Sequence, residues 1–72
     1  MVWIKRRTDD FRLYNTDNYD WVQVNGFTIE MCTDTIEGPV MTSIDFRDVQ
    51  EAQQAFGWLT NAIRNGEKTV YL

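Results

Sequence analysis

Histidine is absent from this 72-residue chain, and cysteine, serine and proline each occur once. Without histidine the chain lacks the commonest general base and metal ligand. Because Cys32 is the sole cysteine, neither an intrachain disulfide nor a cysteine zinc site can form, and one unpaired thiol suits a reducing, cytoplasmic compartment. Ser-His-Asp and Cys-His catalytic groups are excluded as well. We therefore expect no enzyme, no metal and no cofactor.

Long apolar runs are also missing. No stretch approaches the roughly 20 residues of a membrane helix, and the opening Met-Val-Trp-Ile-Lys-Arg-Arg lacks the apolar region of a secretory signal. The four glycines stand apart, so no phosphate-binding loop is present. What remains, with 43% apolar and 25% charged residues, is typical of a soluble globular protein. The length allows one small domain over residues 1–72, which we expect to be marginally stable.

Charge is distributed unevenly along this small acidic protein. The formal net charge is −4, made of +2 over residues 1–12 (four basic, two acidic) and −6 over residues 13–72 (three basic, nine acidic). The molecule as a whole should therefore repel nucleic acid, although its N-terminal segment should not.

Apolar residues alternate in several short segments, as they do in half-buried strands. The predicted strands are Val2–Arg7, Phe11–Asn15, Tyr19–Val24, Phe27–Thr33, Val40–Phe46 and Lys68–Leu72. Between the last two, the period changes to three and four residues, which predicts a helix with its apolar stripe on Val49, Ala52, Phe56, Leu59 and Ile63. Asp48 and Glu51 form a capping box before this helix, and Gly66 ends it. The fold class is α+β: an antiparallel meander of five to six short strands with one helix, in the C-terminal half, packed on one face.

Asn25-Gly26 is the strongest local signal, because this pair favours a two-residue type I′ hairpin turn. The predicted pairs are Val24 with Phe27, Val22 with Ile29, Asp20 with Met31 and, on the other face, Trp21 with Glu30. A slip by one residue would exchange the faces.

One helix covers only one face of a sheet, so the two faces should differ in chemistry. The inward set is Val2, Ile4, Phe11, Leu13, Val22, Val24, Phe27, Ile29, Met31, Ile44, Phe46, Val70 and Leu72, with Val49, Phe56, Leu59 and Ile63 from the helix. The outward set includes all three tyrosines and two of the three tryptophans, side chains that keep a hydrogen-bonding tip.

This uncovered aromatic face is the candidate partner-binding surface, since Tyr and Trp dominate binding hot spots. Its members are Trp3, Tyr14, Tyr19, Trp21 and Glu30, with Trp58 as a further candidate that either folds back over a sheet edge or is exposed. The other interpretation is that these rings only stabilise the sheet through cross-strand pairs.

Two functions fit such a face. The first is a non-catalytic protein-interaction module that docks onto a larger partner or onto a second copy as a homodimer. The second is binding of single-stranded nucleic acid, with the aromatic rings stacking on bases and Lys5, Arg7 and Arg12 contacting phosphates. Glu30 and the sequence pI of about 4.5 oppose the second function.

The organisation resembles small inhibitors encoded by phages and mobile elements, including proteins of the anti-CRISPR type. The features that carry this resemblance are the size, the acidity, the Asn25-Gly26 hairpin and the segment Ile44-Asp45-Phe46-Arg47-Asp48. The resemblance implies a protein target and inhibition by steric occlusion, without implying a role for any single residue.

Overall fold

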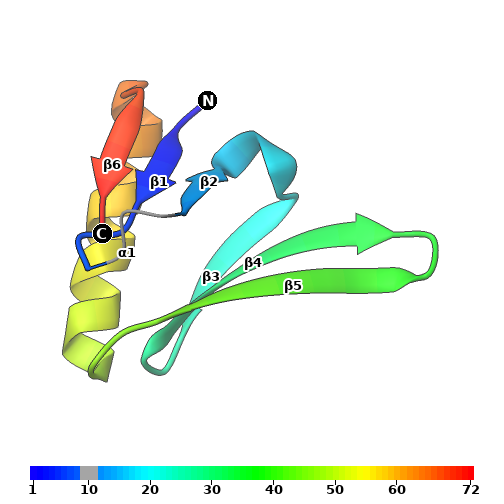
Figure 1. Cartoon of the computed structure of the whole chain (residues 1–72), viewed down its shortest axis with the longest axis horizontal. Coiled ribbons are helices and arrows are strands. Elements are labelled where there is room, and N and C mark those ends of the chain that lie inside the picture. The colour runs from blue at the N-terminus through cyan, green and yellow to red at the C-terminus, as the bar shows by residue number, and fades with distance from the viewer. Residues whose placement is uncertain (9–11) are drawn as a thin grey trace.

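The computed structural model describes residues 1–8 and 12–72 of the chain. They form six strands, a single 3-10 turn and one helix (Figure 1). In chain order the elements are β1 Trp3–Lys5, β2 Leu13–Asn15, the 3-10 turn Thr16–Asn18, β3 Trp21–Asn25, β4 Thr28–Thr35, β5 Gly38–Asp45, α1 Val49–Asn65 and β6 Thr69–Tyr71.

The strands divide between two three-stranded sheets. We call β2-β1-β6 the closing sheet, because its members come from the two ends of the sequence, and β3-β4-β5 the meander sheet. All pairs are antiparallel except β1 with β6, which run parallel. The helix packs against both sheets, through β3, β4 and β6. The expected α+β class is thus confirmed, with the strands in two sheets rather than one continuous meander.

The helix begins and ends where its capping residues predict. Asp48 is the N-cap in an extended conformation, and its Oδ1 accepts a hydrogen bond from the Glu51 backbone N–H (2.8 Å). Gly66 follows the last turn with φ of 67°, in the left-handed region that glycine adopts without a Cβ penalty. Its N–H returns to the carbonyls of Ala62 and Ile63, which closes the helix.

The apolar stripe of the helix is rotated from the predicted one. Three buried alanines, Ala52, Ala55 and Ala62, line the packed side together with Leu59. Val49 and Ile63, both expected in the core, are exposed. Small side chains let the helix approach the sheets closely, which favours the alanine row over the bulkier residues beside it.

The β3–β4 hairpin has a different register from the predicted one. Its closing pair is Asn25 with Thr28, so Gly26 and Phe27 form the turn and Val24 faces Ile29 rather than Phe27. Gly26 has φ of 61°, and no non-glycine residue in the described chain has positive φ. A type II′ turn with glycine first fits these values, whereas type I′ would require positive φ at both central residues. The shift is by two residues, so each β3 side chain keeps its predicted face.

The face assignments of Leu13, Tyr14 and Phe27 are also wrong. Leu13 lies opposite Lys5 and is exposed, whereas Tyr14 lies opposite Ile4 and packs against the core, because the strand has the opposite phase. Phe27 is a turn residue and is exposed as well. The assignment of Phe11 falls outside the described residues. The core itself consists of Val2, Ile4, Ile29, Met31, Ile44, Phe46, Ala52, Ala55, Leu59, Ala62, Val70 and Leu72.

Candidate functional site

The hairpin of β4 and β5 extends beyond the rest of its sheet. The two strands pair over eight residues each, from Thr28–Asp45 to Thr35–Gly38, whereas β3 pairs only with residues 28–32 of β4. In the part of the chain that the structure describes, residues 33–40 therefore have no third strand beside them, and they project from the molecule (Figure 1). We call these residues, together with the adjoining Met41, the protruding tip (residues 33–41).

Side-chain and backbone hydrogen bonds fasten the tip at its base. The Thr33 hydroxyl donates to the Asn18 carbonyl (2.7 Å), and the Asp34 N–H donates to Asp20 Oδ2 (2.7 Å). The Asp20 N–H in turn donates to the Cys32 carbonyl (2.8 Å). These bonds join the tip to the segment that precedes β3, so the hairpin is held in a defined direction where it leaves the body.

Apolar side chains lie exposed on the protruding tip. Ile36, in the two-residue turn, has a relative exposure of 106%, the largest among the exposed large hydrophobic residues. Val40 and Met41 on β5 follow, with relative exposures of 58% and 46%. A fully solvated isoleucine loses the roughly 1.5–3 kcal/mol that its burial would provide. Ile36 and Val40 line one shallow surface, whereas Met41, the next residue of the strand, points to the other face of the sheet. Exposed apolar side chains are typical of interaction surfaces, which makes the tip a candidate site.

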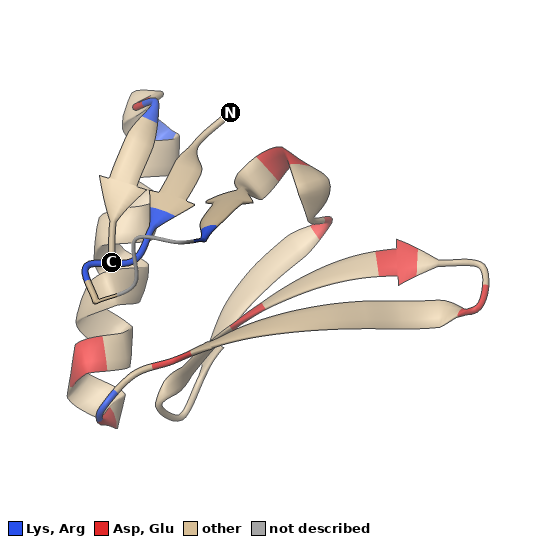
Figure 2. Cartoon of the chain, viewed as in Figure 1, with Lys and Arg blue, Asp and Glu red and all other residues tan. Residues whose placement is uncertain are grey.

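The same hairpin is acidic throughout. Residues 28–45 include four acids, Glu30, Asp34, Glu37 and Asp45, and no lysine or arginine. Figure 2 shows that the charged residues on the tip are all acidic, while the basic residues lie on the part of the molecule that holds the closing sheet and the helix. The tip thus combines an apolar end with a negative flank.

The sequence did not predict this tip. The predicted strands Phe27–Thr33 and Val40–Phe46 leave residues 34–39 as a connecting loop. In the structure β4 continues to Thr35 and β5 starts at Gly38, so only Ile36 and Glu37 remain in the turn. The available signal was the β-prone run that continues through Thr33 and Thr35. The relative lengths of three strands depend on tertiary pairing, which alternation alone does not determine.

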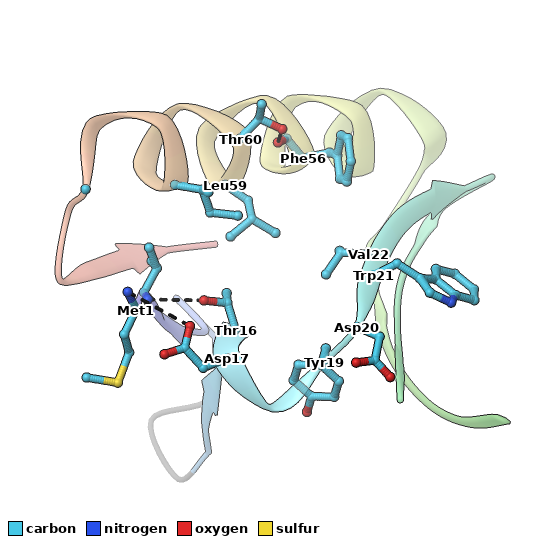
Figure 3. Close-up of a pocket in the computed structure, with 13 residues that line it drawn as sticks. Met1, Thr16, Asp17, Tyr19, Asp20, Trp21, Val22, Phe56, Leu59 and Thr60 are labelled. Carbon is cyan, nitrogen blue, oxygen red and sulfur yellow. Dashed lines mark hydrogen bonds and ion pairs between the residues drawn. The ribbon is translucent and has the colours of Figure 1, made fainter. Parts of the chain in front are cut away.

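A second surface feature is a groove of about 420 Å³ between the helix and the segment leading into β3. Phe56, Leu59 and Ile63 line it from the helix, and Tyr19 and Val22 from the opposite wall (Figure 3). At one end, the N-terminal amine lies 3.9 Å from Asp17, and the Val2 N–H donates to the Thr16 hydroxyl (3.1 Å). The groove is mainly apolar, and the N-terminal amine and Asp17 place opposite charges at one end of it.

Trp21 and Glu30 share the face of the meander sheet that points away from the helix, as predicted. Trp21 lies opposite Cys32, and its ring points away from the groove (Figure 3). Glu30 lies opposite Gln23, whose side-chain amide donates to Glu30 Oε1 (2.7 Å), and the Asn25 amide donates to the same oxygen (3.4 Å). Two neutral side-chain amides therefore hold this carboxylate on the surface of the sheet.

The other four candidate residues lie elsewhere. Trp3 is in the closing sheet. Tyr14 and Tyr19, both expected on the uncovered face, pack against the core. Trp58 is 40% exposed on the helix, with the Arg7 guanidinium 5.0 Å from its ring centroid. The structure therefore does not bring the six candidates together into one aromatic face.

The basic residues considered for nucleic acid lie near the closing sheet. Lys5 Nζ is 6.0 Å from the Tyr71 ring centroid, and Arg7 is stacked over Trp58. Arg12 is exposed just before β2. These contacts place positive charge beside aromatic rings, as a nucleic-acid site would require.

The thiol of Cys32 is buried on the outer face of the meander sheet, between Trp21 and Met41 on the neighbouring strands. Burial raises its pKa above the ordinary value of 9.0, and the carboxylates of Asp34 and Asp20 raise that pKa further. The thiol also donates a weak hydrogen bond to Asp34 Oδ1 (3.9 Å). A protonated, enclosed thiol is a poor nucleophile.

Within residues 1–8 and 12–72, no three His, Cys, Asp or Glu side chains are grouped so as to hold a metal ion. None of the helical segments described is long and apolar enough to cross a membrane. Comparisons with protein-family models, curated proteins and solved structures found no match.

Proposed function

We propose that this chain is a non-catalytic protein-binding domain that docks its protruding tip onto a larger protein. The observation that carries the proposal is Ile36, an apolar side chain fully solvated at the end of an anchored hairpin. The absence of histidine, the enclosed Cys32 thiol and the amide-bonded Glu30 carboxylate all favour binding over catalysis.

The tip also indicates the chemistry of the partner. Ile36 requires an apolar pocket, and Asp34 and Glu37 beside it favour a rim of lysine and arginine. Charges at such a rim mainly increase the association rate and select the partner, while the apolar anchor contributes most of the affinity. The partner surface we propose is therefore basic with a small apolar pocket.

Occlusion is the mode of action that we propose. A hairpin seated in a basic pocket prevents other ligands from reaching that surface, and no chemical step is needed. This agrees with what the resemblance to small phage-type inhibitors implies, namely a protein target blocked sterically.

The test compares partner capture by three versions of the chain: the unmodified protein, Ile36→Ser and Leu13→Ser. Leu13 is a matched control because it is exposed, apolar and located in the closing sheet. A protein captured through the tip should be lost with Ile36→Ser and retained with Leu13→Ser. For a partner so identified, titration should show an affinity about tenfold or more lower for Ile36→Ser, as loss of a buried anchor predicts.

The salt dependence adds an independent readout. Binding of the acidic tip to a basic surface should weaken as salt is raised, since exposed charges are screened. Equal affinities of Ile36→Ser and the unmodified chain for every captured protein would refute docking through the tip.

Single-stranded nucleic acid is the second candidate, favoured by the Lys5–Tyr71 and Arg7–Trp58 contacts. It predicts quenching of tryptophan fluorescence by an oligonucleotide, reduced by Arg7→Gln and falling steeply with salt. Absence of quenching at low salt would eliminate it.

A further inference from the structure

The backbone of β5 forms an open edge of the meander sheet. The strand order is β3-β4-β5, so one side of β5 pairs with β4 and, in the described chain, no strand lies along the other (Figure 1). Thr35 faces Gly38 across the two-residue turn, and the Phe46 N–H donates to the Phe27 carbonyl (2.8 Å). Because hydrogen-bonded and non-bonded pairs alternate in an antiparallel ladder, the N–H and C=O groups of Met41 and Ser43 point away from β4.

The two ends of this edge are each incomplete. Pro39 has no N–H to offer. At the other end, the Asp45 carbonyl already accepts a hydrogen bond from Arg6 Nη1 (3.2 Å), and the Arg6 guanidinium is stacked 4.6 Å from the Phe46 ring centroid. A strand that pairs with this edge therefore finds no N–H at Pro39, and at Asp45 it finds a carbonyl that Arg6 already occupies.

We propose that a second copy of this chain pairs antiparallel with β5, setting Met41 of each copy opposite Ser43 of the other. In this register Pro39 lies opposite Asp45 of the other copy. Pro39 has no N–H to donate, and the Asp45 carbonyl opposite it already accepts a hydrogen bond from Arg6, so neither residue leaves a backbone group unpaired. The outward N–H and C=O groups of Met41 and Ser43, and the Asp45 N–H, all then have partners. The two meander sheets become one six-stranded sheet with a two-fold axis at Thr42.

Neighbouring registers lack this match. Setting Met41 opposite Met41 places the Ser43 carbonyl against Pro39, which cannot donate to it. Setting Ser43 opposite Ser43 places the Met41 N–H against the Asp45 carbonyl, which Arg6 already occupies. Unpaired backbone groups at an interface are costly, so both shifts are disfavoured.

The side chains of β5 are also compatible with self-pairing. Thr42 meets Thr42 at the axis, a favourable cross-strand pair, and the exposed Val40 lies opposite Ile44. The single charged residue of the strand, Asp45, faces Pro39 and not another acid. Lysine and arginine, which commonly protect sheet edges from pairing, are absent from β5.

A single strand pair makes a small interface, so we expect weak, concentration-dependent association. The proposal shares Pro39, Val40 and Met41 with the protruding tip, but it does not use the Ile36 turn that carries docking, and docking does not use Thr42 or Ser43. The two can therefore fail separately: Ile36→Ser tests the first and substitutions at Thr42 and Ser43 test the second.

Disulfide cross-linking between introduced cysteines tests directly which residues of the two β5 strands lie opposite each other. Directly opposed residues in a non-hydrogen-bonded pair have Cα atoms about 4.5 Å apart, within the range of a disulfide, whereas diagonal neighbours are about 7–8 Å apart. Under mild oxidation, Thr42→Cys should form a disulfide-linked dimer and Ser43→Cys should not. The native Cys32 is buried and should not interfere.

Sedimentation of the purified chain over a concentration series supplies the second test. Ser43→Pro removes an outward N–H without removing a bond to β4, and should weaken association about tenfold or more because two hydrogen bonds are lost per dimer. Ser43→Ala keeps the N–H and should associate like the unmodified chain. A monomer at all concentrations, cross-linking of Ser43→Cys, or unchanged association of a folded Ser43→Pro would each overturn the proposal.

Discussion

Trp21→Ala should expose the Cys32 thiol. Trp21 lies opposite Cys32 in the sheet, on the face that the helix does not cover, yet Cys32 is completely buried. Trp21 itself is 39% exposed, so about three-fifths of its surface is covered. For a large aromatic side chain this corresponds to about 90–150 Å² and a loss of about 2–4 kcal/mol in the free energy of unfolding.

The thiol chemistry should change in a defined direction. Burial is the main cause of the raised Cys32 pKa, so removing the indole should lower that pKa toward its ordinary value of 9.0. More thiolate is then present at any given pH below the raised pKa, and reaction with a disulfide reagent such as DTNB should become faster. The pH profile of the rate should also shift to lower pH.

Trp58→Ala is the matched control for this measurement. Trp58 is 40% exposed, nearly the same as Trp21, but lies on the helix. Both variants should lose comparable stability, which separates global unfolding from local exposure of the thiol. If the two variants react with DTNB at the same rate, Trp21 is not the cover of Cys32.

Two further predictions concern the helix. Leu59→Ala should lower the free energy of unfolding by about 2–5 kcal/mol in urea denaturation, because Leu59 is buried, whereas Ile63→Ala should cost about 1 kcal/mol or less, because Ile63 is half exposed. Equal costs would show that the helix has the orientation first expected from the sequence. Asp48→Ala should cost about 0.5–2 kcal/mol in thermal unfolding through loss of the bond to the Glu51 N–H, and Asp48→Asn should retain most of that stability; no difference between them would argue against the cap.

The local signals in the sequence were the reliable ones. The change of hydrophobic period located the helix, and Asp48 and Gly66 defined its ends, because capping depends on neighbouring backbone groups alone. The glycine of the Asn25-Gly26 pair located the first hairpin turn. The exact closing pair was missed because Gly26 fits two turns, as the second residue of a type I′ turn over Asn25-Gly26 or as the first of a type II′ turn over Gly26-Phe27. The backbone of Asn25 and Phe27 decides between them, and the glycine alone does not determine it.

Features that depend on distant contacts were not predictable in this way. The three-residue β2 offers Leu13 and Tyr14 almost equally for burial, and pairing with β1 decides for Tyr14. The protruding tip arises because β4 and β5 extend beyond the end of β3. This difference in strand length depends on how the strands pair in the assembled sheet. The aromatic face failed as one surface for the same reason, since its members are divided among two sheets, the helix and the segment before β3.

The parallel pairing of β1 with β6 has a consequence for the order of folding. Trp3 lies beside Thr69, so these partners are 66 positions apart in the sequence, whereas the strands of the meander sheet are joined by two-residue turns. Closing so long a loop is entropically costly and slows the step that depends on it. During synthesis, the meander sheet can form as soon as its three strands have left the ribosome, whereas β1 can pair with β6 only after β6 has emerged as well. Until then the apolar side chains of β1 and the helix are not fully covered. A chaperone that binds exposed apolar segments would find the largest such surface in this interval.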